Sequence, residues 1–331
     1  MKVSVIIPVY NKGLYVQEAV ESILHGTFTD LEVIAVDDRS TDDSLLRLHA
    51  FCDPRLRIVQ MEKNGGPAAA AQRGIDEAHG EYIVRMDADD IAVPDRIAKQ
   101  VAFMDAHPDI GASGGRLQLF GDDHGQQPFP INSEACKARL VFGVPISQGA
   151  SILRRSVLLM HGLRFDPAWP RIGEDWLFWL NMAPHTRFAN LPETLIHYRR
   201  SSSNITHKRD RTAEGTGLIQ TMFSTLGIPF SQEELALYLL GTFTFKRGLD
   251  ARMVSKLRTW FDRLIQWNET TRFAENQAFR SEIEDRWNRL FFYLPRYSLV
   301  ATMKHMQLSK DWRWTRLTYA MKYYISTRLT S

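Results

Sequence analysis

The stretch EYIVRMDADD, residues 81–90, joins an apolar run to three carboxylates, those of Asp87, Asp89 and Asp90. Residues 82–85 favour a buried strand, so the carboxylates are expected at its carboxyl end. Carboxylates at this spacing repel one another and raise each other's pKa unless a cation or several donors hold them. Hard oxygen ligands in small number suit Mg²⁺ or Mn²⁺ that completes its shell with substrate phosphates. The stretch therefore predicts a divalent metal site, whereas helix capping before Pro94 would explain one aspartate and not three.

The first forty residues predict a βαβ unit. Residues 3–11, VSVIIPVYN, indicate a buried strand ended by Pro8 and Asn11, and helical spacing follows as far as Leu24. Residues 31–36 indicate a second buried strand, with Asp37 and Asp38 at its end. Open α/β sheets bind their ligands outside the carboxyl ends of the strands, so all these acidic groups are expected at one edge of the sheet.

A third predicted strand, residues 56–60, leads into NGGPAAAAQRGI, residues 64–75. The two glycines allow close approach of the backbone, and the alanine-rich helix behind them can lie near the sheet or near a nucleotide. No Gly-Lys-Ser/Thr follows, and the glycine spacing differs from the dinucleotide fingerprint. This pattern disfavours P-loop nucleotidases and Rossmann dehydrogenases.

Five motifs in order resemble those of the inverting nucleotide-sugar glycosyltransferases of family 2. They are residues 3–11, 36–42, 64–75, 86–90 with Pro94, and 173–176. The resemblance covers about residues 1–206 and implies the GT-A fold, an α/β fold with a mainly parallel twisted sheet flanked by helices. It also implies sugar transfer with inversion from a nucleoside diphosphate sugar, usually a UDP-sugar.

The same resemblance implies roles for single residues. Asp38 is expected to hold the nucleotide base, Asp87 to lie near the ribose, and Asp89, in the DXD pattern, to bind Mn²⁺ or Mg²⁺. The other residues expected beside the nucleotide are Pro8, Tyr10, Asn11, Asn64 and Gly65. A metal at Asp89 would neutralise the charge that develops on the departing diphosphate.

The segment GEDWLFW, residues 173–179, supplies the candidate general base. Two carboxylates stand directly before an aromatic-rich helix, whose apolar wall can raise a carboxyl pKa toward the useful range. Family resemblance selects Asp175 as the base and leaves Glu174 to position it or to contact the sugar. The alternative is an acidic pair at a helix N-terminus, with Trp176 and Trp179 as ordinary core residues.

Three further residues are expected near the donor or the acceptor: Gln148, Trp176 and Arg199. Residues 146–155 predict a loop and a strand that resemble the family's segment between donor sugar and acceptor, and residues 195–206 resemble its closing Tyr-Arg motif. Arg199 could meet a phosphate bidentately. The chain departs from the family pattern at Ala71 and Gln72, where Arg-Asn is common, and at Ser201, where a histidine is common.

Charge is distributed unevenly along the 331 residues, whose formal net charge is +3. Residues 1–200 are acidic overall and residues 201–331 are basic, which predicts two modules, a catalytic domain at 1–206 and a helical extension at 207–331. Two cysteines are too few for a disulfide framework, so a reducing cytoplasm is expected. Neither a signal segment nor a membrane-spanning run is recognised.

The last part of the extension combines basic and aromatic residues. Residues 286–331 hold nine Lys or Arg, with Asp311 alone in opposition, and aromatic residues are interleaved among them. Amphipathic helices of this composition bind anionic membrane surfaces, where a lipid-linked acceptor would lie. Packing on the catalytic domain is the alternative, and nucleic acid is not an expected partner because no recognised binding motif is present.

The sequence thus predicts transfer of a hexose or N-acetylhexosamine from a UDP-sugar to a surface polysaccharide or lipid-linked oligosaccharide. Two other functions fit parts of the pattern. A nucleotidyltransferase that acts on sugar phosphates also places acidic residues at sheet ends, but it predicts an Arg/Lys-rich loop near the N-terminus, which Lys12 and Gly13 scarcely provide. A non-catalytic scaffold of the same fold would bind sugar nucleotides without turnover.

Overall fold

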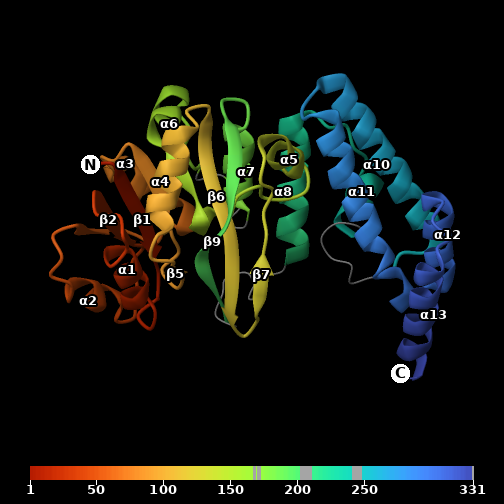
Figure 1. Ribbon diagram of the computed structural model, residues 1–331, viewed down its shortest axis with the longest axis horizontal. Coiled ribbons are helices and arrows are strands. Elements are labelled where there is room, and N and C mark those ends of the chain that lie inside the picture. The colour runs from red at the N-terminus through yellow and green to blue at the C-terminus, as the bar shows by residue number, and fades with distance from the viewer. Residues whose placement is uncertain (167–168, 170–172, 202–210, 241–247, 330–331) are drawn as a thin grey trace. The chain divides into compact units, whose positions relative to one another are not determined.

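The computed structural model describes residues 1–331 apart from 167–168, 170–172, 202–210, 241–247 and 330–331. The chain divides into two compact units, Met1–Asp210 and Arg211–Ser331. The predicted boundary at residues 206 and 207 lies outside the described residues. An α/β first unit and a helical second unit confirm the predicted fold class (Figure 1).

The first unit is built on a nine-stranded sheet in the order β3-β2-β1-β4-β8-β6-β9-β5, with β7 paired to β6. Its first four strands are parallel, whereas β8 pairs antiparallel with both β4 and β6. The strand bounds are β1 Val3–Val9, β2 Leu31–Asp37, β3 Leu56–Gln60, β4 Tyr82–Arg85, β5 Ile91–Ala92, β6 Ile110–Gly121, β7 Gly125–Gln127, β8 Ile152–Arg154 and β9 Arg187–Arg200. Strand β1 therefore lies between β2 and β4, and β1 and β2 are the two parallel strands of the predicted βαβ unit.

Proline lies inside β1 instead of ending it. The Ile6 carbonyl accepts a hydrogen bond from the Met86 amide on the β4 side, and Pro8, two residues on, faces the same side. Because pairing between β1 and β4 stops at Ile6 and Arg85, the missing amide of Pro8 breaks no bond of the ladder. The strand therefore continues to Val9, and the loop begins one residue before Asn11.

Helices cover both faces of the parallel part of the sheet. The odd-numbered residues of β1 join a core cluster with α1, α2 and α4, while α3 packs against Ile6 and Val36 on the opposite face. The helices of this unit are α1 Val16–Leu24, α2 Ser44–His49, α3 Pro67–Glu77, α4 Arg96–Ala106, α5 Ser133–Arg139, α6 Arg155–His161 and α7 Glu174–Met182. This layering leaves the carboxyl ends of β1, β2 and β4 as a shared edge.

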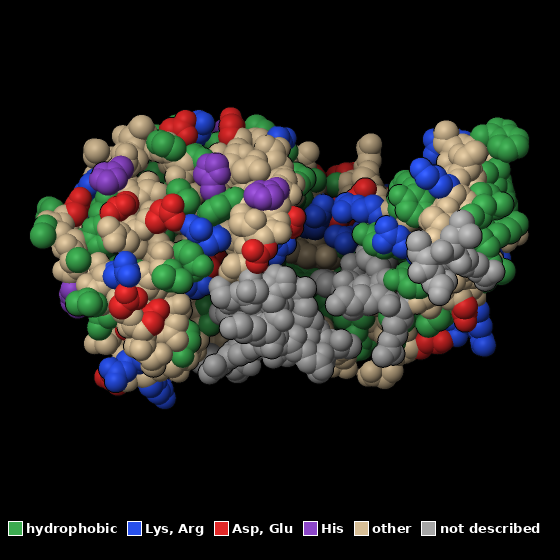
Figure 2. All heavy atoms as spheres, turned by 90° about the horizontal axis from the view of Figure 1, so that it is seen from below, with side chains coloured by type: hydrophobic (Ala, Val, Ile, Leu, Met, Phe, Trp, Pro, Cys, Tyr) green, Lys and Arg blue, Asp and Glu red, His purple; other side chains and the backbone are tan. Residues whose placement is uncertain are grey.

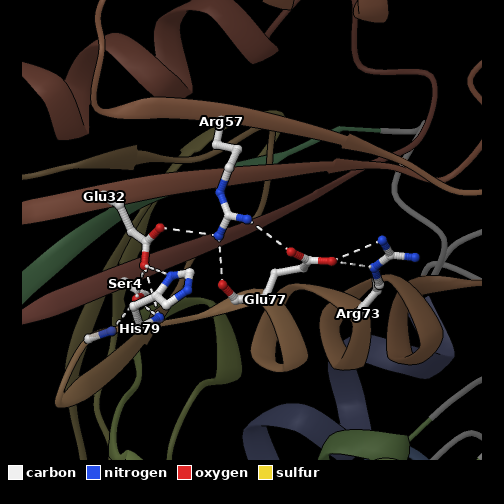
Figure 3. A network of polar contacts seen from close by, with 7 residues as sticks. Ser4, Glu32, Arg57, Arg73, Glu77 and His79 are labelled. Atoms are coloured by element: carbon white, nitrogen blue, oxygen red, sulfur yellow. Dashed lines mark hydrogen bonds and ion pairs between the residues drawn. The ribbon is translucent and has the colours of Figure 1, made fainter.

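At the amino ends of the strands, charges of opposite sign are matched. The buried Glu32 carboxylate accepts hydrogen bonds from Ser4 Oγ at 2.7 Å and from Arg57 Nη2 at 3.2 Å. Arg57 also pairs with Glu77 at 2.9 Å, and Arg73 pairs with the same carboxylate at 2.9 Å (Figure 3). Two carboxylates thus meet two guanidinium groups, and this edge holds a balanced network.

Where the structure describes the second unit, its regular elements are helices and no strand is found, in agreement with the predicted extension. Its helices are α8 Arg211–Leu226, α9 Gln232–Leu239, α10 Ala251–Thr271, α11 Asn276–Phe291, α12 Leu299–Ser309 and α13 Trp314–Leu329. Helix α9 is described as far as Leu239, and residues 241–247 lie outside the described residues. Apolar residues at helical spacing on α10 form its buried side.

A histidine forms part of the core of this unit. His305 is fully buried, stacks on Trp287 with ring centroids 4.2 Å apart, and donates from Nε2 to the Trp287 carbonyl at 2.8 Å. Burial lowers the pKa of His305 to about 4, so the ring is neutral at physiological pH. Along the described parts of the chain, we find no helix with the length and apolar character needed to cross a bilayer.

A substitution at Gly74 of α3 tests whether this helix lies as close to the sheet as the structure describes. A Cβ at this position would lie 2.3 Å from Cγ2 of Ile6, a β-branched side chain with little freedom to move. We expect Gly74→Ala to destabilise the protein by about 1–3 kcal/mol through overpacking, more than the ~0.5–1 kcal/mol that alanine gains in a helix. Urea denaturation measures the difference.

Gly217→Ala in α8 is the matched control, because no atom of the described residues outside the helix's own backbone lies within 4 Å of its Cβ position. This variant should keep or slightly raise the free energy of unfolding. Equal effects of the two substitutions would show that α3 does not approach the sheet as described.

Candidate active site

The loop after β4 brings the predicted acidic cluster to the carboxyl edge of the sheet. The Met86 amide donates to the Ile6 carbonyl at 3.1 Å, and the Asp90 amide closes a turn onto the Asp87 carbonyl at 3.2 Å. Asp89 and Asp90 are buried, and Asp87 is half-buried. The chain therefore holds all three carboxylates within one tight turn.

Burial and mutual repulsion dominate the electrostatics of this turn. Burial, and next the charges of Asp87 and Asp89, raise the pKa of Asp90 well above its ordinary value. The pKa of Asp87 is raised as well, again chiefly by burial. Asp90 Oδ1 accepts the Arg199 amide at 2.9 Å. Its Oδ2 is buried and has no hydrogen-bond partner among the residues that the structure describes. Such an atom invites a proton or a cation.

Lys12 is the partner of Asp89, which the sequence did not indicate. Its Nζ forms an ion pair with Asp89 Oδ2, and its amide donates to Ser44 Oγ at 2.8 Å. Asp42 holds the same loop by accepting the Gly13 amide at 2.9 Å. The ammonium group therefore provides positive charge at the carboxylate expected to bind a metal.

Two buried arginines lie beneath the loop and were also missed. Arg85 is 4% exposed, and its charge acts on Asp87, Glu174 and Asp175. Arg96 is fully buried and donates to the Arg85 carbonyl at 2.7 Å and to Gln100 Oε1 at 3.0 Å. Burial lowers the pKa of Arg96 to about 9, and the charges of Asp90 and Asp87 oppose that shift. An arginine in an apolar strand beside an acidic cluster was the available sequence signal.

The candidate base, Asp175, lies in the first turn of α7. The helix begins directly after Gly173, whose backbone is in the left-handed region with φ 81°. Burial, with a smaller contribution from the charge of Asp87, raises the pKa of Asp175 to about 6. Burial and the charge of Asp175 raise the pKa of Glu174 to about 8. Residues about ninety positions apart in the sequence thus act on one another electrostatically, as the prediction of a common site requires.

The residues predicted around the nucleoside lie in two neighbouring loops. Asp38 accepts the Gly65 amide at 2.7 Å and the Gly66 amide at 2.8 Å, and Asn64 donates to the Asp38 carbonyl at 3.0 Å. Asn11, in the left-handed region with φ 52°, accepts the Thr41 amide at 2.8 Å. These bonds join the ends of β1 and β2 to the start of α3.

Tyr10 and Pro8 stand at the carboxyl end of β1, where Tyr10 is exposed and Pro8 is half-buried. Tyr10 therefore presents an aromatic surface to solvent beside the Asn11 loop. Such a ring suits stacking on a planar base.

Gln148 begins a short helical turn, Gln148–Ala150, that packs on the acidic loop. A Cβ at Gly149 would lie 3.0 Å from Asp87 Oδ2 and 3.6 Å from Asp90 Oδ2. Gln100 of α4 fixes this turn by donating a hydrogen bond to the Ala150 carbonyl at 2.9 Å. Gln148 is half-buried next to the carboxylates.

Trp176 and Arg199, which were predicted to contact the donor or the acceptor, contact other protein groups instead. Trp176 is 3% exposed and donates from its indole to the Leu140 carbonyl at 2.7 Å, so it belongs to the core. Arg199 donates to the Asp89 carbonyl at 2.8 Å and to Glu18, and its guanidinium lies over the rings of Tyr15 and Phe120. We therefore assign Arg199 to fastening β9 on the acidic loop and do not retain either residue as a ligand contact.

The departures from the family pattern have structural partners too. Gln72 accepts the Phe165 amide at 3.0 Å and donates to Asp76 at 2.8 Å, while Ala71 is buried. Ser201 is half-buried at the end of β9, and residues 202–206 of the predicted closing motif lie outside the described residues. Gln72 is thus used to hold the chain near Phe165.

Carboxyl groups outnumber cationic side chains around the acidic loop. The nearby cations are Lys12, Arg85, Arg96 and Arg199, and the carboxyl groups are those of Asp87, Asp89, Asp90, Glu174 and Asp175. Burial favours the protonated form of Glu174 and Asp90. In the described ranges, no three His, Cys, Asp or Glu residues are arranged to hold a metal ion by themselves. The donor set fits a hard divalent ion that takes few protein ligands and completes its shell with phosphate oxygens.

Comparison with known proteins defines the class as glycosyltransferase. The model of glycosyl transferase family 2 matches residues 4–159. An uncharacterized glycosyltransferase of Haemophilus influenzae is 32% identical over 231 residues, which cover 64% of this chain and 71% of that protein. The putative glycosyltransferase EpsE of Bacillus subtilis is 32% identical over 207 residues, covering 61% and 74%. The chain belongs to glycosyltransferase family 2.

Solved structures share the fold at low sequence identity. TarS residues 1–349 of S. aureus, in complex with UDP-GlcNAc, superpose with a TM-score of 0.63 and 19% identity over 100% of this chain and 93% of that chain. The mannosyltransferase PcManGT of Pyrobaculum calidifontis, in complex with GDP-Man and Mn²⁺, gives a TM-score of 0.53 and 17% identity over 98% and 87%. These likenesses agree with the predicted GT-A fold.

Arg96→Met tests whether buried cations hold the acidic loop. The substitution leaves Asp87 and Asp90 buried with less compensating charge, so we expect it to destabilise the protein by about 3–5 kcal/mol. Arg73→Met is the matched control, because Arg73 is exposed and its pair with Glu77 should contribute at most about 0.5 kcal/mol. Similar unfolding midpoints in urea for both variants would contradict the role of Arg96.

Proposed function

We propose that the chain is an inverting, metal-dependent glycosyltransferase that moves a hexose or N-acetylhexosamine from a nucleoside diphosphate sugar to a glycan hydroxyl. UDP is the proposed nucleotide, and a surface polysaccharide or lipid-linked oligosaccharide is the proposed acceptor. The observation that carries the proposal is the cluster of carboxyl groups at the carboxyl edge of the sheet, where the charge of Asp87 acts on Asp175. The UDP-GlcNAc of TarS supports a UDP-sugar, and the GDP-Man of PcManGT is the alternative to test.

The difference in pKa between Glu174 and Asp175 supports the choice of base. With a pKa of about 6, Asp175 is mostly ionised at neutral pH and can accept a proton. With a pKa of about 8, Glu174 is mostly protonated there and can donate a hydrogen bond to a sugar oxygen. The two neighbours are therefore suited to different tasks.

The proposed reaction is a single displacement. Asp175 takes the proton of the acceptor hydroxyl as its oxygen bonds to the anomeric carbon, and the bond from that carbon to the diphosphate oxygen breaks on the opposite face. The nucleoside diphosphate leaves with the electron pair. One displacement inverts the anomeric configuration, which NMR spectroscopy of the product can read directly.

The residues proposed to hold the nucleotide are those at the ends of β1 and β2. Tyr10 and Asp38 would face the base, with Pro8, Asn11, Asn64 and Gly65 shaping the loops around it, and Asp87 would meet the ribose. Asp38 already binds two amides, so its contribution is to fix the Gly65 loop as well as to accept a further hydrogen bond.

A divalent ion would be held by Asp89, with Lys12 displaced from that carboxylate and substrate phosphates as the other ligands. When bound, Mn²⁺ or Mg²⁺ supplies positive charge to the departing diphosphate. The Mn²⁺ in the PcManGT complex supports this choice of metal. Gln148, beside Asp87, is proposed to contact the donor sugar or the acceptor.

A panel of nucleotide sugars tests the function. We expect one UDP-sugar to raise the thermal stability of the protein and to release UDP when Mn²⁺ is present. Binding without release of any nucleotide, with or without glycan acceptors, would favour the non-catalytic scaffold. Release of pyrophosphate from a nucleoside triphosphate and a sugar phosphate would favour the nucleotidyltransferase.

Asp175→Asn should lower kcat by about 10²–10⁴-fold, the usual contribution of a general base, and leave the Kd for UDP unchanged. In the wild type, kcat/KM should fall about tenfold per pH unit below pH 6, because protonated Asp175 cannot accept the acceptor proton. Glu174→Gln, the matched control, should retain most of kcat. Normal transfer by Asp175→Asn would reject the assignment of the base.

Asp89→Ala should abolish the dependence of transfer on Mn²⁺ and lower kcat/KM by roughly 10²–10³-fold, since charge on the leaving group is then neutralised less well. Asp95→Ala is the control, because this half-buried aspartate pairs with Lys99 at 2.7 Å. Steady-state rates over a Mn²⁺ titration give the comparison. Full wild-type turnover in excess chelator would refute a metal at Asp89.

A further inference from the structure

Helix α13 is apolar on two opposite sides. One side packs on the second unit: Arg316 lies over the Phe291 ring, the Tyr319 hydroxyl donates to the Phe292 carbonyl, and Ala320 is buried. Trp314, Met321 and Ile325 lie on roughly the opposite side at helical spacing. They are 80%, 50% and 50% exposed, and we call them the α13 outer stripe.

An apolar outer side is unusual for a helix that already buries its other side, because solvent-facing positions are normally polar. The neighbouring turn extends the apolar surface, since Trp312 is 49% exposed. Figure 2 shows apolar side chains exposed on the second unit. An exposed patch of this kind marks a binding surface.

The charges around the stripe are of one sign. Residues 312–331 contain no Asp or Glu, while Arg313 and Lys322 are exposed beside the stripe. The nearest acid along the chain, Asp311, is taken up by ion pairs with Arg313 and Arg316. The helix therefore offers an apolar stripe flanked by cations, which is complementary to an apolar layer beneath an anionic surface.

From this pattern we infer that the α13 outer stripe inserts into the headgroup region of an anionic lipid membrane. Trp314 and Trp312 suit the boundary between headgroups and acyl chains, where tryptophan is enriched, and Met321 and Ile325 extend the buried line along the helix. Lys322 meets the lipid phosphates, while the Arg313 guanidinium is held in its ion pair with Asp311. The contact is peripheral, since the helix lies on the surface and does not cross it.

A second copy of the chain is a poorer occupant for this surface. A symmetric contact through the stripe would bring the same cations of both copies together, and no acidic residue of α13 could offset them. Anionic lipid removes that repulsion. The inference concerns binding alone and does not rest on the proposed transfer reaction.

Co-sedimentation of the full chain with vesicles tests the inference. We expect the wild type to pellet with vesicles of equal parts phosphatidylcholine and phosphatidylglycerol, to stay in solution with phosphatidylcholine alone, and to be released by high salt. The stripe variant, with Trp314→Ser, Met321→Ser and Ile325→Ser, should bind the mixed vesicles at least tenfold more weakly. Lys322→Gln should weaken binding less and reduce its dependence on salt.

The control variant removes exposed apolar side chains of the first unit, with Leu46→Ser, Leu159→Ser and Met160→Ser. It should bind vesicles as the wild type does, and circular dichroism should show that both triple variants remain folded. Equal vesicle binding by the wild type and the stripe variant would overturn the inference. So would a wild type that fails to bind the mixed vesicles, or that self-associates in sedimentation velocity while the stripe variant stays monomeric.

Discussion

The site depends on a cluster of carboxyl groups that outnumber the cations at the carboxyl edge of a parallel sheet. Five carboxyl groups lie there within electrostatic reach of Lys12, Arg85 and Arg96. One of their oxygens, Asp90 Oδ2, is buried and has no hydrogen-bond partner among the described residues. At the amino edge of the same strands, Glu32 and Glu77 are matched by Arg57 and Arg73. The contrast within one sheet indicates that the imbalance serves ligand binding and not stability.

Each part of the fold contributes to that imbalance. Strand β4 ends early and leaves the 87–90 turn against β1, α4 places Arg96 beneath it, and α7 brings Glu174 and Asp175 to its side. Burial raises the pKa of Glu174 more than that of Asp175, so near pH 7 Asp175 is mostly ionised and Glu174 mostly protonated. A divalent cation would bind the ionised carboxylates and share its positive charge with the phosphates of a ligand. This is why the geometry suits a nucleoside diphosphate sugar.

The sequence predicted the strands well because their apolar runs end in turn residues and acids, as in residues 31–38. It located the acidic loop and the α7 pair because motif order survives at low identity. It missed Lys12, Arg85 and Arg96, since the partners of a buried cation depend on packing between segments far apart in the chain. It also placed Arg199 and Trp176 beside the ligand. In the structure Arg199 contacts Glu18 and Tyr15, and Trp176 donates to the Leu140 carbonyl. These partners lie far away in the sequence, so no local pattern announces them.

The most direct measurement is anomalous diffraction from crystals that contain Mn²⁺ and UDP. The account predicts an anomalous peak for Mn²⁺ within coordination distance of an Asp89 carboxylate oxygen and of both phosphates. The Lys12 ammonium should have moved away from that carboxylate. UDP bound at the edge of the sheet without such a peak, with Lys12 still paired to Asp89, would contradict it.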